Sequence, residues 1–379
     1  MLLTATMQEP LLKTNCLVDR TPTAKSYTVA NNNCEMEIQF SGGLLGRSSH
    51  ESNERIATFL QGCVVGLVMW PALLWAAFRY TPPPPPPESF ERLEGPEKHA
   101  NITVLFLLLY TNISRILRVV IRDRGFEFVN SEVMIGSITV QAIATISVSL
   151  MIFFPTPVVV EPATGIRTHL VRWCEWTVVG FLMTFLTESV DMSLGIKENK
   201  QQQQQADTPI LNTKRFPIVP WLHGLAIGIS TSAGALSSFC TTKAQWWTVI
   251  GISWFLLCSL FLRLYQRFQR LKKISPGNSV EEMEEYDRAK YSLKTTAVCT
   301  VLWTGLASSW TVISIVAPHS SSDNLFYNPA LMLVTESFFE ALFKIWYADM
   351  LIEIHNIVFD DASRTIRRLE ELRSLMGAV

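Results

Sequence analysis

The most unusual charged residue of this chain is Lys344, which lies in the last apolar stretch. Glu340 and Glu336 precede it by four and eight residues, so the three side chains share one helix face. A charge inside a membrane-length apolar helix costs roughly 3 kcal/mol, and such residues usually pair, line a cavity or carry function. The stripe therefore predicts a buried cation held by carboxylates. The alternative is that the span ends near Tyr347 and the lysine ammonium reaches the cytosolic surface.

A second pair of charges occurs in the sequence RWCEW, where Arg172 and Glu175 are three residues apart and can meet along a helix. Tryptophans recur at helical spacing further along the chain, as the pair Trp246–Trp247 and as Trp303 and Trp310, which are seven residues apart. Taken singly, such tryptophans are most often packing residues or part of an interfacial aromatic belt. Their combination with the charges is what points to a binding site.

The composition is that of an integral membrane protein. Of 379 residues, 48% are hydrophobic and only 17% are charged, and the mean hydropathy is positive. The formal net charge of −1 gives no reason to expect a nucleic-acid partner. The seven cysteines show no CxxC spacing, so neither a metal site nor a disulfide framework is predicted.

An all-α membrane bundle is the predicted fold, because about 20 apolar residues cross a bilayer as a helix and eight such stretches occur. They cover approximately residues 56–78, 100–121, 132–154, 168–190, 217–240, 244–262, 293–317 and 328–350. Lys and Arg gather after the second, fourth and sixth stretches and are sparse in the opposite loops. This bias predicts a multi-pass protein whose N- and C-termini are both cytosolic.

The remaining segments are predicted to be connections and tails. Residues 1–54 are polar and expected to be disordered, and residues 80–99 form an outer loop with a stiff proline run at 82–87. Residues 358–379 carry apolar residues at alternating spacings of four and three, which is typical of a coiled coil. We expect this cytosolic linker to form a homo- or heterodimer or to contact an effector. The alternative is an amphipathic helix on the membrane surface or a solvated amphipathic tail.

Together these features resemble the microbial (type I) rhodopsin family over residues 100–357. The resemblance rests on RWCEW as the third-helix motif, Trp246–Trp247 in the fifth helix, Trp303 and Trp310 in the sixth, and EALFK in the seventh. It implies that Lys344 binds all-trans retinal through a protonated Schiff base, with Glu175 and Glu340 as counterions. Two cations, Arg172 and the Schiff base, would then balance two carboxylates.

The resemblance also implies further contacts with retinal. Four tryptophans would shape the apolar slot for the polyene, namely Trp176, Trp247, Trp303 and Trp310. Glu336 would either tune the field or be a neutral, hydrogen-bonded acid. His223 falls where many members of the family have an acid facing the ring end of retinal, and its alternative role is that of a hydrogen-bonded core residue.

The expected output is signalling. Leu186 stands where an outward proton pump of the family has a carboxylate, which argues against efficient pumping. The extra helix over residues 55–79 and the coiled-coil exit resemble enzyme-linked rhodopsins, which control a guanylyl cyclase or a cyclic-nucleotide phosphodiesterase. No catalytic domain is recognisable within the chain itself. The alternatives are a light-gated ion channel, a light-driven pump and a transporter unrelated to rhodopsins.

Overall fold

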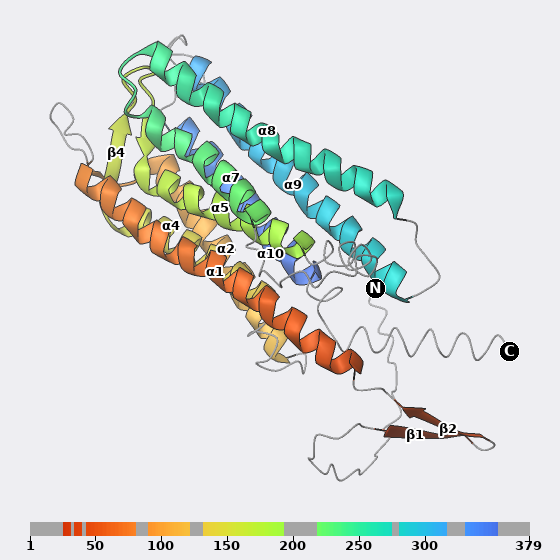
Figure 1. The fold of residues 1–379 in the computed structure, drawn as a ribbon. Helices are drawn as coiled ribbons and strands as arrows, with labels where there is room; N and C mark the ends of the chain where they lie inside the picture. Colours follow the sequence, from red (N-terminus) through yellow and green to blue (C-terminus); the bar gives the residue numbers. More distant parts are fainter. Residues whose placement is uncertain are drawn as a thin grey trace, which may run out of the picture. The chain divides into compact units, whose positions relative to one another are not determined.

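The fold is mostly helical. The computed structural model describes residues 26–31, 34–39, 43–80, 90–121, 132–192, 218–274, 280–316 and 330–354. Within these residues there are eight helices, which are α1 (Gly43–Tyr80), α2 (Gly95–Ile121), α4 (Glu132–Phe153), α5 (Leu170–Met192), α7 (Ile218–Ser237), α8 (Lys243–Lys273), α9 (Val280–Val316) and α10 (Leu331–Ile354). Each predicted apolar stretch coincides with one of these helices, although α1, α8 and α9 are considerably longer than the stretches inside them (Figure 1).

Five of these helices, among the described residues, are long and apolar enough to cross a membrane. They are α1, α4, α5, α8 and α9. Charged and polar residues lower the mean hydropathy of the other helices, and several of these residues belong to the site described below. The molecule thus has the composition and helix lengths of a membrane protein.

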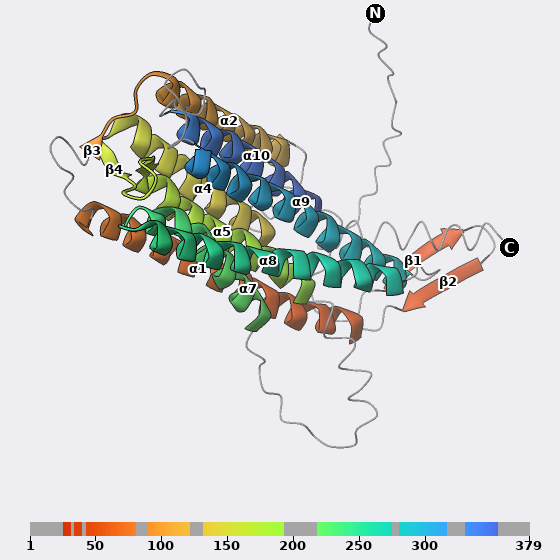
Figure 2. The same ribbon diagram turned by 90° about the horizontal axis from the view of Figure 1, so that it is seen from above.

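Seven helices form a closed ring in sequence order. Each helix from α2 to α10 contacts the next one along the chain, and α10 returns to contact α2. Figure 2 shows α2, α10 and α9 side by side at this closure. The helix α5 is central, because every residue from Leu170 to Ser189 is buried. Side chains on α5 therefore face the other helices, not the surroundings.

The additional helix α1 packs on the outside of this ring. Gly62 and Gly66 of α1 lie against Phe185 and Leu182 of α5, where a β-carbon on either glycine would come within 2.6 Å of the facing side chain. Trp70 Nε1 donates a hydrogen bond of 3.1 Å to Ser147 Oγ on α4. Cys174 Sγ of α5 also donates to the backbone carbonyl of Leu73 at 3.5 Å, so close packing and polar contacts fix the extra helix to α4 and α5.

Two small sheets depart from the all-α prediction. One hairpin pairs β1 (Ser26–Asn31) with β2 (Cys34–Gln39) inside the unit formed by residues 1–54, which was predicted to be disordered. Tyr27 and Val29 alternate with small or polar residues in β1, and Ile38 follows the alternating glutamates of β2, a pattern that favours strands. The second sheet has the order β3 (Phe90–Glu91), β4 (Thr156–Val160) and β5 (Arg167–His169), all antiparallel.

The turn between β4 and β5 places an acid against the end of the bundle. Glu161 N donates to Ile166 O at 2.8 Å, and Gly165 adopts a φ of +75°, which residues with a β-carbon rarely adopt. The predicted proline run at 82–87 and the coiled coil at 358–379 lie outside the described residues.

Candidate functional site

Lys344 is buried inside the ring of helices. Its side chain is 1% exposed, and its ammonium group pairs with Glu175 of α5 and with Oε1 of Glu340, the latter at 2.9 Å. The alternative in which the lysine reaches the surface is therefore wrong. The stripe on α10 predicted from the sequence does meet a carboxylate from a second helix.

Arg172 completes this group of charges. Its guanidinium pairs with Glu340 and donates to Oδ1 of Asn101, with a longer bond of 3.4 Å to Ser337 Oγ. Neither the arginine nor the two glutamates expose any surface. We call Arg172, Glu175, Glu340 and Lys344 the buried charge cluster. Its two positive and two negative charges cancel, which is the condition under which buried ions are tolerated.

Glu340 and Glu175 do not play equal parts in the cluster. Glu340 is shared between Lys344 and Arg172, while Glu175 pairs with Lys344 alone among the described residues. The second oxygen of Glu175, Oε2, is buried and has no hydrogen-bond donor among those residues. Glu175 is therefore the carboxylate that depends most on the charge of Lys344.

A group of aromatic rings begins beside the lysine. The Trp176 ring centre lies 5.7 Å from Lys344 Nζ, and Trp176 packs edge-on against Trp303 and Phe343 at 5.9 and 6.1 Å between ring centres. Trp303 and Phe343 approach to 4.3 Å. The indole nitrogens of Trp176 and Trp303 are buried without a hydrogen-bond partner in the described part of the chain. Phe343 precedes the lysine directly and was not predicted to belong to this wall.

Trp310 lies two turns beyond Trp303 on α9 and belongs to a different aromatic group. Its ring centre is 5.5 Å from that of Trp173 and 6.1 Å from that of Trp246. Trp310 is 5% exposed, and its indole nitrogen has no partner among the described residues. Trp173 links the two groups, since its ring centre also lies 5.8 Å from that of Trp176.

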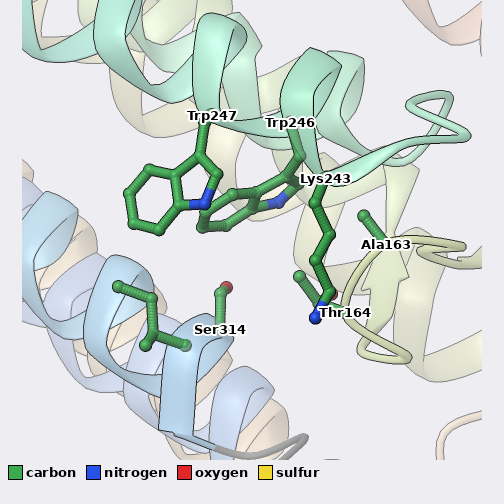
Figure 3. Close-up of a pocket in the computed structure, with 7 residues that line it drawn as sticks. Ala163, Thr164, Lys243, Trp246, Trp247 and Ser314 are labelled. Carbon is green, nitrogen blue, oxygen red and sulfur yellow. The ribbon is translucent and has the colours of Figure 1, made fainter.

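The structure does not bring Trp247 to this wall. Consecutive helix residues point about 100° apart, so only one member of the Trp246–Trp247 pair can face the bundle. That member is Trp246, which is 3% exposed, while Trp247 is 52% exposed. Trp247 instead lines a shallow pocket of about 80 Å³ with Lys243, Thr164 and Ser314, at the first turn of α8 (Figure 3).

His223 of α7 is half-buried, and its Nδ1 has no hydrogen-bond partner among the described residues. The charges that act on it are those of Glu188, Arg263 and Arg267. Glu188 accepts hydrogen bonds from Arg263 Nη2 at 2.5 Å and Nε at 3.2 Å, and it pairs with Arg267 at 3.1 Å. This second ionic group joins the last turns of α5 to α8.

Glu336 is buried at 3% exposure, one helical turn before Glu340. It interacts electrostatically with Arg172 and, more weakly, with Glu161 and Glu97. Glu336 therefore lies beside the buried charge cluster without being a direct partner of Lys344 in the structure.

Glu161, in the turn after β4, is a further buried acid that the sequence did not single out. It accepts hydrogen bonds from Thr164 and Ser237, each at 2.6 Å, and from Thr168 and the Trp246 indole, each at 3.3 Å. Burial raises the pKa of this carboxyl, and the hydrogen bonds counteract part of that effect.

Two polar contacts that support the cluster were also missed, because nothing in the sequence pairs their partners. Asn101 of α2 meets Arg172 across 71 residues of chain, and Gln141 of α4 donates to the backbone carbonyl of Lys344 at 3.3 Å across 203 residues. The only sequence signal for Asn101 or Gln141 is that each is a polar residue within an apolar stretch.

Comparison with known proteins adds no family. No protein-family model matches the chain, and no curated protein sequence matches it. The functional argument therefore depends on the geometry of the buried charge cluster and its aromatic surroundings.

Proposed function

We propose that this chain is a retinal-binding membrane photoreceptor of the microbial rhodopsin type. The observation that carries the proposal is the pairing of buried Lys344 with Glu175 and Glu340 beside Trp176 and Trp303. A retinal Schiff base requires a buried primary amine, anions that stabilise its positive charge and apolar aromatic walls, and these groups occur together here. The ring of seven helices in sequence order, with α10 contacting α2, agrees with the same proposal.

The residues present fit the cofactor. Retinal is an aldehyde on a long apolar polyene, and Lys344 is a primary amine held inside the bundle. The indole nitrogens of Trp176 and Trp303 make no hydrogen bond to the described part of the chain, so these rings act as apolar walls. When bound, retinal supplies absorption of visible light and isomerisation of its chain.

The residues of the chain would stabilise the charge on the Lys344 nitrogen and accept its proton. Glu175 stabilises a positive charge on the Lys344 nitrogen and is placed to accept its proton. Glu340 is paired with Arg172, so it keeps its negative charge when the Lys344 nitrogen loses its proton to Glu175. The central position of α5 excludes water from this exchange, which strengthens each electrostatic interaction.

The bundle would cross the membrane eight times, with α1 as the additional span and both termini in the cytosol. A change at Lys344 would shift α10 and the chain that follows it, acting on a dimer partner or a cytosolic effector of cyclic-nucleotide metabolism. Leu186 is fully buried in the apolar core at the cytosolic half of α5, which supports signalling over pumping. Photocurrents that reverse at an ion's equilibrium potential would instead favour a channel.

The experiment that tests the proposal is reconstitution of the purified protein with all-trans retinal. We expect a visible absorption band, and a retinyl adduct on the peptide containing Lys344 after borohydride reduction. Lys344→Ala should give neither. Lys273→Ala, which removes an exposed lysine at the end of α8, should give both. A band that persists in Lys344→Ala would contradict the assignment.

A further inference from the structure

Asn101 is buried where the first turns of α2 meet the buried charge cluster. It begins an Asn-Ile-Thr sequence that fits the N-glycosylation pattern, yet its side chain is 0% exposed. A fully buried amide is inaccessible to glycosylation in the folded protein. The position of Asn101 therefore needs another explanation.

Both ends of the Asn101 amide are used. Its Oδ1 accepts from Arg172 Nη2, and its Nδ2 donates to the backbone carbonyl of Glu97 at 2.9 Å. A guanidinium can only donate and a carbonyl can only accept, so only this orientation of the amide satisfies both partners. The contact with Glu97 thus fixes the oxygen toward the arginine.

Arg172 has few other acceptors. Glu340 takes one side of the guanidinium, Ser337 lies at 3.4 Å, and Nε has no hydrogen-bond partner within the described ranges. A buried guanidinium that loses an acceptor is destabilised, because no water replaces the lost hydrogen bond. Asn101 is the neutral acceptor opposite Glu340.

We infer that Asn101 is a positioning residue, which holds Arg172 against Glu340 and thereby sets the charge balance around Lys344. This inference rests on the proposed function for its meaning, since the charge balance governs the colour of the bound chromophore. Without Asn101, the guanidinium is free to turn toward Glu336, a buried acid that acts on it in addition to Glu175. Glu340 and Glu175 then lose part of the positive charge that keeps them ionised.

The test is a pH titration of visible absorption in the retinal-bound protein. In Asn101→Leu, the midpoint of the acid colour change should rise by about one pH unit, the effect of losing one charge-assisted hydrogen bond. Asn101→Asp keeps the shape and the acceptor oxygen but draws Arg172 away from Glu340 by its charge, so its midpoint should rise as well. If the leucine variant does not fold, the titration of the aspartate variant tests the inference.

The matched control is Asn112→Leu, the same substitution three turns further along α2 at a half-buried position. Its midpoint should equal that of the unmodified protein. A midpoint that stays constant or falls in both Asn101 variants would overturn the inference, as would an equal rise in Asn112→Leu. A purely structural role would lower the thermal unfolding temperature without moving the midpoint.

Failure of the proposed function is distinguishable from failure of this inference. If the unmodified protein forms no visible band, retinal binding is wrong. The ionisation of the buried carboxyls can then be followed in the retinal-free protein by the infrared carbonyl band of protonated acids. The Asn101 variants should show that band at higher pH than the Asn112 control, and equal bands would overturn the positioning role.

Discussion

Lys344 Nζ lies 2.9 Å from Glu340 Oε1 while the other oxygen of the same carboxylate is paired with Arg172. Glu340 thus forms ion pairs with two cations, whereas the ion pair of Glu175 among the described residues is with Lys344. This asymmetry separates two glutamates that the sequence presents as equivalent.

The first prediction concerns the retinal-bound spectrum. Glu175→Gln should produce a large red shift or bleaching at neutral pH, because it removes a carboxylate whose ion pair is with Lys344. Glu340→Gln also removes one negative charge, but it should shift the spectrum less, because Glu175 remains paired with the Lys344 nitrogen. Absorption spectra at several pH values measure both. A larger effect of Glu340→Gln would reverse the assignment.

A second prediction compares two arginines that pair with glutamates. Arg172→Gln leaves buried Glu340 without one of its cations and should lower the free energy of unfolding by about 3 kcal/mol. Arg167→Gln removes an arginine that pairs with Glu91 and Glu97 at 27% exposure, and should cost less than about 1 kcal/mol. Thermal unfolding in detergent measures the difference. An equal decrease in the free energy of unfolding for both variants would show that the buried ion pair stabilises the protein no more than the partly exposed one.

Two glycines provide a third prediction. A β-carbon on Gly234 of α7 would lie 2.3 Å from the Trp173 ring, whereas one on Gly251 of α8 would meet nothing within 4 Å. Gly234→Ala should therefore destabilise the protein by about 1 to 3 kcal/mol. Gly251→Ala should be neutral or stabilise α8 by up to about 1 kcal/mol, because alanine favours helices. Similar unfolding temperatures for both variants would refute the close approach of α7 to α5.

The fourth prediction is a pH dependence of stability. Burial raises the pKa of Glu161, so the folded state favours the protonated carboxyl. That contribution is complete at low pH and is lost as the pH rises through the raised pKa. As the pH rises from the ordinary glutamate range toward the raised pKa, the unmodified protein should lose stability relative to Glu161→Gln, which does not titrate.

Unfolding temperatures at each pH measure this difference, with Glu94→Gln as the control at an exposed site. The raised pKa of Glu97 is present in all three proteins and cancels in the comparison. Parallel curves for the unmodified protein and Glu161→Gln would show that the Glu161 carboxyl is not perturbed.

Much of the helical layout was predictable, because apolar runs of membrane length and helical spacing are local properties. The same holds for the stripe from Glu336 to Lys344. The β1–β2 hairpin was missed because composition was taken to mean disorder, although Tyr27, Val29 and Ile38 alternate as in strands. The end of α8 was placed too early and the start of α9 too late, since polar residues continue a helix beyond its apolar part.

Contacts between distant segments were the part that sequence could not provide. The choice of Trp246 over Trp247 as the buried ring depends on the rotation of α8, which no local pattern determines. His223 was assigned a role from the family resemblance, and no local pattern pairs it with the charges of Glu188, Arg263 and Arg267 that act on it. Asn101 gained its role only through the closure of the ring between α2 and α10.

The pairing of Lys344 with two carboxylates also has a consequence for assembly. A lysine attacks an aldehyde only as the neutral amine, yet here both glutamates favour the ammonium form. If retinal binds as proposed, its attachment would break an ion pair and release a proton before the amine adds to the aldehyde, and water would leave as the imine forms. Uptake of retinal is then expected to be slow and to accelerate with rising pH, because the charges that would stabilise the protonated Schiff base also stabilise the unreactive ammonium.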